Sequence, residues 1–479
     1  DVCFFRSTDP ATGAPLRAQR RRVKARRVLS SVTLAGTVAD FERAFQTGVA
    51  AFQTAGRHLF LSTTTPVKLP DSLLTVVDSD QPAPSPVRKE SRLPSPLPAP
   101  TPPGDKLLAA PTLPGYSILD LAQAYQFPPD ATGEGQVIGI LELGGKLNQA
   151  DLKTFFEQVV KIKKPRIIEV GTPPPSTGST EILNNAEVAL DIQVVGALAP
   201  QAKLVVYYGT TMIEALQTVV SDEVNKPTVL SVSWAGSEYN YTAAEVQEIN
   251  MLLYQASLLG ITVVAASADH GAYNGLSFPN VSLPASSPLA LACGGTIPTL
   301  TDQTLSDEVV WNEYNGQVAS GGGYSHLYGQ PSYQTQAVAK YPYQRGTTRG
   351  VPDVAANASV IHGYRIISAG TLTEIGGTSG ATPFVAALVA LLNQKLGYRL
   401  GYLNEVLYSF AGSSAFRPIT QGNNQLYAAA PYWNPCTGLG SIVGSELLAL
   451  LQMLEQASTP RPAPTPAPPA PEADEAPSA

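Results

Sequence analysis

Short strand-like segments alternate with helix-like segments through residues 114–457, and this alternation constrains the fold more than any other feature of the chain. The strand-like segments are rich in β-branched residues and end in glycine or polar residues: 136–145, 202–209, 227–236 and 261–269. Helix-like sequence lies between them, notably at 185–195 and 243–258. The pattern predicts an α/β domain with a doubly wound, mostly parallel sheet. We expect its site beyond the carboxyl ends of the strands.

Segments of different character flank this domain. Residues 1–80 are predicted to form a small α/β unit, in which 38–46 has the pattern of a short amphipathic helix. Residues 81–113 contain ten prolines and little periodicity, which predicts an extended linker that is open to proteolysis. Residues 458–479 are acidic and rich in proline and alanine, and we expect a disordered tail there.

The charge of the chain excludes some partners. Only 14% of its residues are charged, and 31 of them are Lys or Arg, against about 25% charged residues in a typical protein. In acid, carboxylates lose their charge and basic groups keep theirs, so a small number of basic residues limits self-repulsion. The composition therefore suits a protein that works in acid, and equally a neutral extracellular one. The net charge of −7 argues against a nucleic-acid partner.

Neither a membrane segment nor a cysteine framework is visible. No apolar run reaches the roughly 18 residues that a spanning helix needs, so we expect no membrane partner. The chain opens with Asp1 and shows no signal peptide. Its three cysteines, Cys3, Cys293 and Cys436, lack the spacing of a disulfide framework or a metal site. The sequence neither requires nor excludes a Cys293–Cys436 disulfide.

The sharpest local signal is GGTSGATP at residues 376–383. The two glycines allow an unusual backbone path just before Ser379, and the sequence that follows is helical in pattern. Ser379 is thus expected at a helix N-terminus, where free N–H groups favour a developing negative charge. Pro383 is expected in the first turn, whose amides lack intrahelical partners. The alternative is that Ser379 is simply an N-cap.

A serine nucleophile needs a base, and no histidine lies in a convincing context. None of the four histidines occurs in the His-Gly-Thr-His helix start of a subtilisin-like enzyme; they are His58, His270, His326 and His362. Each is more often a surface residue than a base.

Carboxylates offer another route. Glu187 and Asp191 lie four residues apart on a predicted helix with apolar neighbours, so they share one face. Two like charges on a partly buried face raise each other's pKa and share a proton, which suits a general base in acid. Asp269 ends a predicted strand, at the edge where such folds bind ligands. The alternatives are a solvated acidic face for the pair and an N-cap or turn role for Asp269.

Taken together, these motifs resemble the sedolisin family of serine-carboxyl peptidases. GTSGATP matches the family's Gly-Thr-Ser-x-x-x-Pro, and the Glu-x-x-x-Asp helix and the strand-end aspartate are also present. Further blocks follow in family order, among them ILELGG (140–145), SVSWAGSE (231–238), ASGGGYS (319–325) and RGVPDVAANAS (349–359). The resemblance implies a subtilisin-like catalytic domain at 114–457. It also implies that residues 1–80 are the end of an inhibitory prodomain.

The resemblance implies a mechanism as well. Ser379 attacks the peptide carbonyl, and Glu187, oriented by Asp191, accepts its proton. Asp269, protonated in acid, donates a hydrogen bond to the oxyanion together with the Ser379 N–H. Trp234 is expected near the site, or in the core. The family reading predicts a secreted, monomeric, acid-active endopeptidase that cuts proteins or peptides and is inhibited by its own prodomain.

One departure concerns the family's calcium site. Pro418 and Asn434 stand where two aspartates are expected, Ile419 remains, and Ala430 and Tyr432 replace glycines. Because both charged ligands are lost, we expect no metal requirement. Tyr432 is expected to deny the loop a glycine backbone, and packing of Tyr432 and Trp433 is expected to hold it instead. The loss leaves a non-catalytic binding or scaffold protein as an alternative to the peptidase; a subtilisin-like neutral protease is a third reading, disfavoured by the missing histidine motif.

Overall fold

The computed structural model describes residues 49–53, 59–63, 115–343 and 346–458. Of the predicted N-terminal unit, two strands are described, β1 (Val49–Gln53) and β2 (Leu59–Thr63), which pair antiparallel. The expected helix at 38–46, the linker at 81–113 and all but the first residue of the tail at 458–479 lie outside the described residues.

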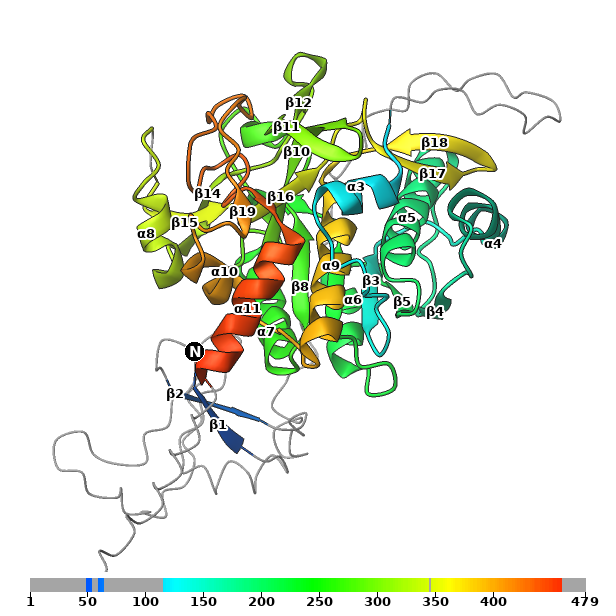
Figure 1. Cartoon of the computed structure of the whole chain (residues 1–479), viewed down its shortest axis with the longest axis horizontal. Helices are drawn as coiled ribbons and strands as arrows, with labels where there is room; N and C mark the ends of the chain where they lie inside the picture. Colours follow the sequence, from blue (N-terminus) through cyan, green and yellow to red (C-terminus); the bar gives the residue numbers. More distant parts are fainter. Residues whose placement is uncertain (1–48, 54–58, 64–114, 344–345, 459–479) are drawn as a thin grey trace, which may run out of the picture.

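The larger part of the described chain is built on a ten-stranded sheet of order β19-β20-β16-β10-β8-β6-β3-β5-β4, with β11 paired to β10 (Figure 1). Every neighbouring pair from β20 to β4 is parallel, while β19 and β11 pair antiparallel. The strands are β3 (Val137–Glu142), β4 (Arg166–Val170), β5 (Lys203–Tyr208), β6 (Val229–Val232), β8 (Thr262–Ala266), β10 (Leu291–Thr301), β11 (Thr304–Val310), β16 (Val354–Asn357), β19 (Phe416–Arg417) and β20 (Ser441–Ile442). The predicted mostly parallel sheet is confirmed.

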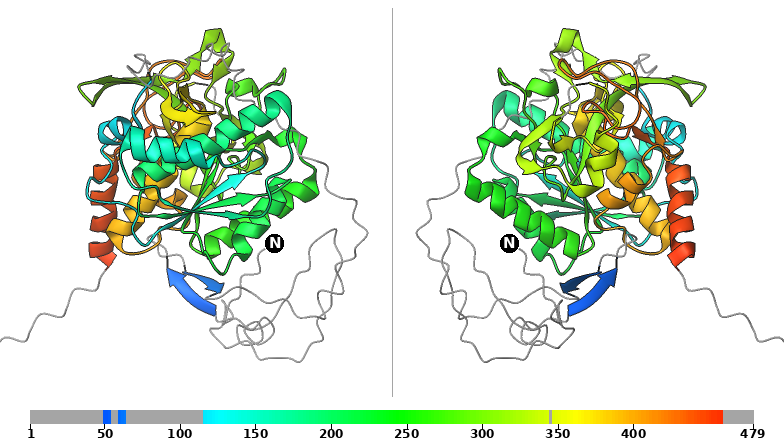
Figure 2. Two further views of the ribbon diagram at one scale, coloured as in Figure 1. Left: turned by 90° about the vertical axis from the view of Figure 1, so that its right-hand side faces the viewer. Right: turned by 90° about the vertical axis from the view of Figure 1, so that its left-hand side faces the viewer.

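Helices cover both faces of this sheet (Figure 1; Figure 2). On one face lie α5 (Gly178–Leu198) and α9 (Thr378–Leu396), with α3 (Ile118–Ala124) and α11 (Gly444–Ser458) packed beside them. On the other face lie α6 (Met212–Ser221) and α7 (Ala243–Leu258). The predicted helices at 185–195 and 243–258 are confirmed as parts of α5 and α7.

The side chains of the strands alternate between two cores, as a pleated sheet requires. In β3, Ile138 and Ile140 pack in the core under α5 and α9, whereas Leu141 packs in the core under α6 and α7. α9 is buried along nearly its whole length, Thr378 to Asn393. Its apolar residues contact β3, β6, β8, β10 and β16. The helix that carries Ser379 is therefore buried in the core and contacts five strands of the sheet.

Smaller elements complete the described chain. They are α4 (Gln149–Lys153), the π-helix η1 (Thr154–Val160), α8 (Thr335–Val338), α10 (Asn404–Ser409), and the paired strands β7 (Gly236–Ser237) with β9 (Ser282–Leu283), β12 (Asn312–Glu313) with β13 (Val318–Ala319), β14 (Gly323–Gly329) with β15 (Thr348–Val351) and β17 (Tyr364–Ser368) with β18 (Thr371–Ile375). Four short 3-10 segments of the described chain lie among them, of which η3 (Gly271–Tyr273) matters below.

Cys293 and Cys436 are both buried free thiols. The bridge that the sequence left open is therefore absent. Cys293 lies in β10 and is part of the large core, while Cys436 packs in a small separate cluster with Ile419 and Tyr427. Burial raises the pKa of both thiols, so they behave as small apolar side chains.

Candidate active site

Ser379 is the second residue of α9, and Gly377 occupies the N-cap position. The N-cap interpretation of Ser379 is therefore wrong. Gly377 has φ +92°, and a Cβ atom there would lie 2.6 Å from Asp269 Oδ2. Only glycine fits both conditions. The turn leaves the Ser379 amide in the first turn of the helix, where it has no intrahelical acceptor and can face an anion.

The sequence predicted Pro383 in the first turn of the helix, and this prediction is wrong. The helix α9 begins at Thr378, and Pro383 is its sixth residue. Proline has no N–H, so the carbonyl of Ser379 loses its helical hydrogen bond. Ser233, which directly follows β6, lies near this carbonyl, with its Oγ 3.4 Å away. The same Oγ donates to Asp191 Oδ1 at 2.9 Å. One hydroxyl thus connects the serine helix to the acidic pair.

Glu187 and Asp191 lie on α5 and are 4% and 0% exposed. The solvated-face alternative is therefore wrong. Burial raises the pKa of Glu187 to about 8, the Ser379 side chain lowers this pKa, and the charge of Asp269 raises it. The Ser379 Oγ itself donates to the Ser233 carbonyl at 3.4 Å. Burial, and then the charges of Glu142 and Glu187, raise the pKa of Asp191 well above its usual value, while the bond from Ser233 lowers it.

Two buried carboxyl oxygens of this pair, Glu187 Oε1 and Asp191 Oδ2, accept no hydrogen bond from the described residues. A buried carboxylate oxygen without a donor is costly. A proton on one carboxyl, shared with the other, removes that cost. The geometry therefore favours a protonated or singly ionised pair over two charges.

Glu142, the last residue of β3, was missed by the sequence reasoning. It is fully buried, and Trp234 Nε1 donates to its Oε2 at 2.9 Å. Burial, and then the charge of Glu187, raise its pKa well above the usual value. Trp234, expected near the site or in the core, is buried and also fixes this third carboxyl. The available signal was an acidic residue ending the apolar strand ILE, at the edge where Asp269 also lies.

Asp269 follows β8 and is 5% exposed. Its Oδ1 accepts from the Thr378 N–H at 2.8 Å and from the Thr378 Oγ1 at 2.7 Å. The carboxyl therefore binds the start of α9, and His270 rather than Asp269 caps η3. Burial raises the pKa of Asp269, while the two bonds from Thr378 lower it. Its other oxygen, Oδ2, is left for a ligand beside Gly377 and Ser379.

No histidine of the described chain contacts Ser379. His270 Nδ1 lies 3.4 Å from the Gln317 carbonyl, and His326 forms an ion pair of 2.6 Å with Glu238. His362 stacks on Tyr116, and His58 lies outside the described residues. The four residues predicted for the site, Ser379, Glu187, Asp191 and Asp269, lie close enough to act on one another's pKa, and the groups around Ser379 are carboxyls.

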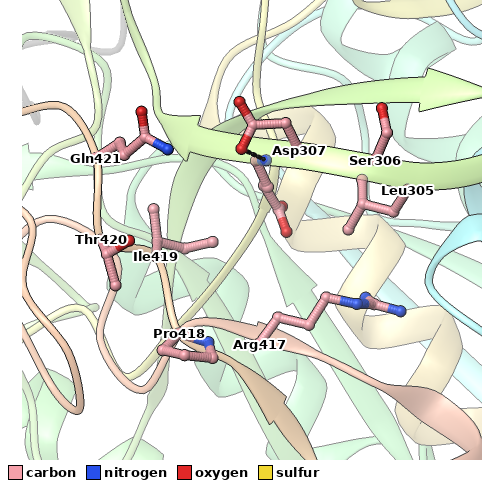
Figure 3. Close-up of a pocket in the computed structure, with 9 residues that line it drawn as sticks. Leu305, Ser306, Asp307, Arg417, Pro418, Ile419, Thr420 and Gln421 are labelled. Carbon is pink, nitrogen blue, oxygen red and sulfur yellow. Dashed lines mark hydrogen bonds between the residues drawn. The ribbon is translucent and has the colours of Figure 1, made fainter.

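A hollow of about 170 Å³ lies elsewhere (Figure 3). Its lining comes from residues 305–308 of β11 and 417–421 after β19, and no member of the acidic cluster takes part. Figure 3 shows the Arg417 side chain extending below Leu305 and Ser306. Arg417 donates to the Ala124 carbonyl at 3.0 Å, so it ties α3 to this edge of the sheet. The hollow is separate from the catalytic arrangement.

The loops matched to a calcium site contain no carboxylate where two were expected, and no group of three His, Cys, Asp or Glu in the described parts of the chain could hold a metal ion. Trp433 is fully buried and its Nε1 donates to the Pro352 carbonyl at 2.9 Å, as packing of the loop requires. Tyr432 is 49% exposed, so its expected packing role is wrong. Its φ of +66° also shows that the glycine-like backbone persists despite the side chain.

Comparison with known proteins gives consistent matches. The model of the subtilase family matches residues 170–407. Kumamolisin from Bacillus sp. (strain MN-32) is 41% identical over 366 residues, covering 73% of this chain and 66% of kumamolisin. Sedolisin from Pseudomonas sp. (strain 101) is 30% identical over 381 residues, covering 72% of this chain and 63% of sedolisin. The chain spans slightly less than two thirds of the length of these relatives.

The solved structure of Pseudomonas sedolisin, a serine-carboxyl proteinase complexed with two molecules of pseudo-iodotyrostatin, superposes with a TM-score of 0.64 at 28% identity. The match covers 72% of this chain and 99% of that one. The subtilisin-like fold expected from the motifs is confirmed.

Proposed function

The chain belongs to the sedolisin family of serine-carboxyl peptidases, and from this premise we propose that it is an acid-active serine-type endopeptidase made as a self-processing proenzyme. One observation carries the proposal: a serine at a helix N-terminus lies near a carboxyl that is 4% exposed and whose pKa is raised, and the serine side chain acts on that pKa. The non-catalytic alternative has no comparable support, because a scaffold has no need of four buried carboxyl groups beside one serine.

In the proposed reaction, the Ser379 Oγ attacks the carbonyl carbon of the scissile bond while its proton passes to Glu187. Glu187 later donates that proton to the leaving amine. Asp191 holds the other proton of the pair and lies on the same face of α5, one turn away. Ser233, through its bond to Asp191 Oδ1, keeps that carboxyl turned toward the serine helix.

The oxyanion that forms would be held by two donors. The Ser379 N–H is available because it begins α9, and Asp269 supplies an O–H from its Oδ2 when the carboxyl is protonated. Both bonds from Thr378 fall on the other oxygen, Oδ1, so the proton is directed to Oδ2. An ionised Asp269 would repel the oxyanion instead.

These roles predict a pH window. Glu187 and Asp191 must together have lost one proton, and the raised pKa of Glu187, about 8, opposes that loss in acid. We propose that the Ser379 side chain, which lowers this pKa, and the bound substrate let the pair lose one proton in the working range, below which activity falls. Asp269 must keep its proton, so activity falls as pH rises through its raised pKa. The result is a bell-shaped profile with its optimum in acid.

The same proposal covers the rest of the chain. Residues 1–80 would act as an intramolecular inhibitor until the linker 81–113 is cut, and the substrates would be proteins or peptides. We propose a secreted monomer. No helix of the described chain is long and apolar enough to cross a membrane.

The direct test is to incubate the purified full chain at about pH 4, near the ordinary carboxyl pKa values, and at about pH 7, well above them, and to follow its mass and its digestion of a denatured protein. Processing and digestion are expected in acid only. Ser379→Ala should abolish both, and Glu187→Gln should lower the rate by about 10²–10⁴. Processing by a clean Ser379→Ala preparation, or an optimum at neutral pH, would overturn the proposal.

The maturation site can be read from the same samples by N-terminal sequencing. We expect a first residue shortly before Pro114, because the described domain begins at once: the Gly115 N–H donates to Glu374 Oε1 at 2.6 Å, and Tyr116 bridges to Tyr364 of β17. A first residue within 116–142 would contradict this, since α3 and β3 lie there.

A further inference from the structure

We infer that the side-chain amide of Asn434 takes the place of a metal ion in the loop formed by residues 417–421 and 430–438, called here the Asn434 loop. The loop is then held by neutral hydrogen bonds, without calcium and without a titrating group. The inference does not depend on the proposed catalytic roles, because it concerns the stability of the fold.

The amide nitrogen of Asn434 contacts the two backbone carbonyls that would otherwise face a cation. Asn434 Nδ2 donates to the Ile419 carbonyl at 3.3 Å and to the Ala430 carbonyl at 3.1 Å. In the sequence match, both carbonyls belong to the expected calcium ligands. One –NH₂ group has two hydrogens to donate, so it satisfies both of them.

The orientation of this amide is fixed by its other end. Asn434 Oδ1 accepts from the Cys436 N–H at 3.0 Å, the Thr437 N–H at 3.1 Å and the Thr437 Oγ1 at 3.2 Å. A flipped amide would place its –NH₂ against the two N–H donors and its oxygen against the two carbonyls. The network therefore determines which atom faces Ile419 and Ala430.

Asn434 is fully buried, and every polar atom of the residue has a partner. Its backbone N–H and C=O both bond to Gly438, at 3.0 Å and 2.9 Å. Calcium prefers about six to eight oxygen ligands, usually with several carboxylates, at about 2.3–2.6 Å. Here a cation would meet amide hydrogens instead of a carboxylate, and Pro418 supplies no side-chain oxygen. The residues present do not fit the ion.

The backbone of the Asn434 loop nevertheless keeps the course that presents these carbonyls. Tyr432 holds a left-handed φ of +66°, a conformation that usually favours glycine. The Ile419 side chain packs with Val310, Ala429 and Cys436 in a small core, which leaves its carbonyl toward Asn434. Trp433 is anchored from the other side by its bond to Pro352. Packing thus positions the carbonyls, and the Asn434 amide donates a hydrogen bond to each of them.

This exchange has a consequence for an enzyme that works in acid. Carboxylate ligands release calcium when they are protonated, so a calcium-bound loop weakens as pH falls. An amide carries no proton that titrates in this range. The Asn434 loop should therefore stay folded in acid and in the absence of calcium.

The test uses thermal unfolding of the purified full chain, which carries Ser379→Ala to prevent self-digestion. Unfolding is measured with excess chelator and with about 1 mM free calcium, a concentration that reaches the Kd of weak extracellular calcium sites. We expect the same Tm in both conditions and no calcium bound in equilibrium dialysis. A fall of several degrees on chelation, or one equivalent of bound calcium, would overturn the inference.

Variants then test the position itself. Asn434→Asp replaces the amide with a carboxylate facing two carbonyls, so its Tm should fall without calcium and recover on addition of calcium at pH 7. Asn434→Leu should lose stability without such recovery. If Asn434→Asp folds but does not respond to calcium, the position is not a converted cation site and the inference fails. If it does not fold, the chelation and dialysis results on the unsubstituted Asn434 decide.

Asn404 provides a matched control. It is also buried, and its Nδ2 also donates to two carbonyls, Pro288 at 3.2 Å and Ala290 at 2.9 Å. It lies on α10, where no cation is expected. Asn404→Asp should be destabilised with no recovery in calcium; an equal recovery there would show that the response is generic and would also overturn the inference.

Discussion

Three buried carboxyls around Ser379 illustrate how much single residues depend on their surroundings. Glu142, Glu187 and Asp191 are ordinary acidic residues in sequence, yet burial raises the pKa of each. The bonds from Trp234 and Ser233 act in the opposite direction and stabilise the ionised forms. The protonation state of the cluster is therefore set by a few hydrogen-bond donors, which makes individual substitutions informative.

Asp269→Asn is expected to retain partial activity, and its kcat/KM should no longer fall as the pH rises. Asparagine keeps an N–H donor for the oxyanion at every pH, whereas Asp269 donates only while protonated, and its pKa is raised by burial. Profiles of kcat/KM against pH for both proteins test this. An unchanged alkaline limb in the variant would show that another group controls it.

Ser233→Ala is expected to shift the acid limb of the profile of kcat/KM against pH to higher pH. The Ser233 hydroxyl donates to Asp191 and lowers its pKa, so its loss makes the pair hold its protons to higher pH. A hydrogen bond to a charged group contributes about 1.5–3 kcal/mol, so kcat/KM at the acid end should drop by tenfold or more. Ser233→Thr keeps the hydroxyl and should restore the limb. A lower rate with an unmoved pH profile would indicate a structural effect alone.

At the scale of elements, α9 combines a helix with a catalytic turn. Its N-terminus needs Gly377 and its C-terminus ends on Gly397, both with positive φ. A Cβ at Gly377 would meet Asp269 Oδ2 at 2.6 Å, whereas nothing lies within 4 Å of one at Gly397. The two ends therefore tolerate substitution differently.

Gly377→Ala is expected to reduce activity by at least the tenfold that corresponds to about 1.4 kcal/mol, because the added methyl displaces Asp269 or the start of α9. Gly397→Ala is the matched control. It carries the strain of a positive φ, about 1 kcal/mol or more, without touching the site. Rates and Tm of both variants separate the two effects; equal loss of activity in both would mean that backbone strain alone is responsible.

Across the whole molecule, the acidic cluster makes stability depend on pH in an unusual direction. The folded pKa of Glu187, about 8, exceeds the ordinary glutamate value, so the native state holds protons that the unfolded chain releases. Stability from such a group is full below the unfolded pKa of about 4.3 and declines as pH rises toward the folded pKa. Glu142, Asp191 and Asp269 shift in the same direction.

We therefore expect the Ser379→Ala chain to have a higher Tm near pH 4 than near pH 8, the ends of this range. Glu142→Gln removes one buried ionisable group and should flatten the dependence. Differential scanning calorimetry across the range gives the measurement. A Tm that rises steadily from pH 4 to pH 8 would mean that the cluster does not dominate the linkage.

The sequence by itself determined the class of fold and pointed to the candidate site residues. β-Branched runs, helix patterns and turn glycines act locally, so the parallel sheet, α5, α7 and the position of Ser379 at the start of a helix followed from them. Glu187 and Asp191 could be paired because helical spacing is fixed. What it could not give was contact between distant segments.

Tertiary structure alone decided the rest. Glu142 joins the cluster because β3 lies beside β6 and faces α5, a neighbourhood that no local pattern encodes. The Ser233 hydroxyl lies near both Asp191 and the Ser379 carbonyl. In the sequence, Ser233 is 42 positions from Asp191 and 146 positions from Ser379. The loss of two aspartates predicted a weakened calcium site, but only the folded loop places the Asn434 amide against the Ile419 and Ala430 carbonyls. Hydrogen bonds and desolvation act at a few ångströms in space, so their partners become known only when the chain is folded.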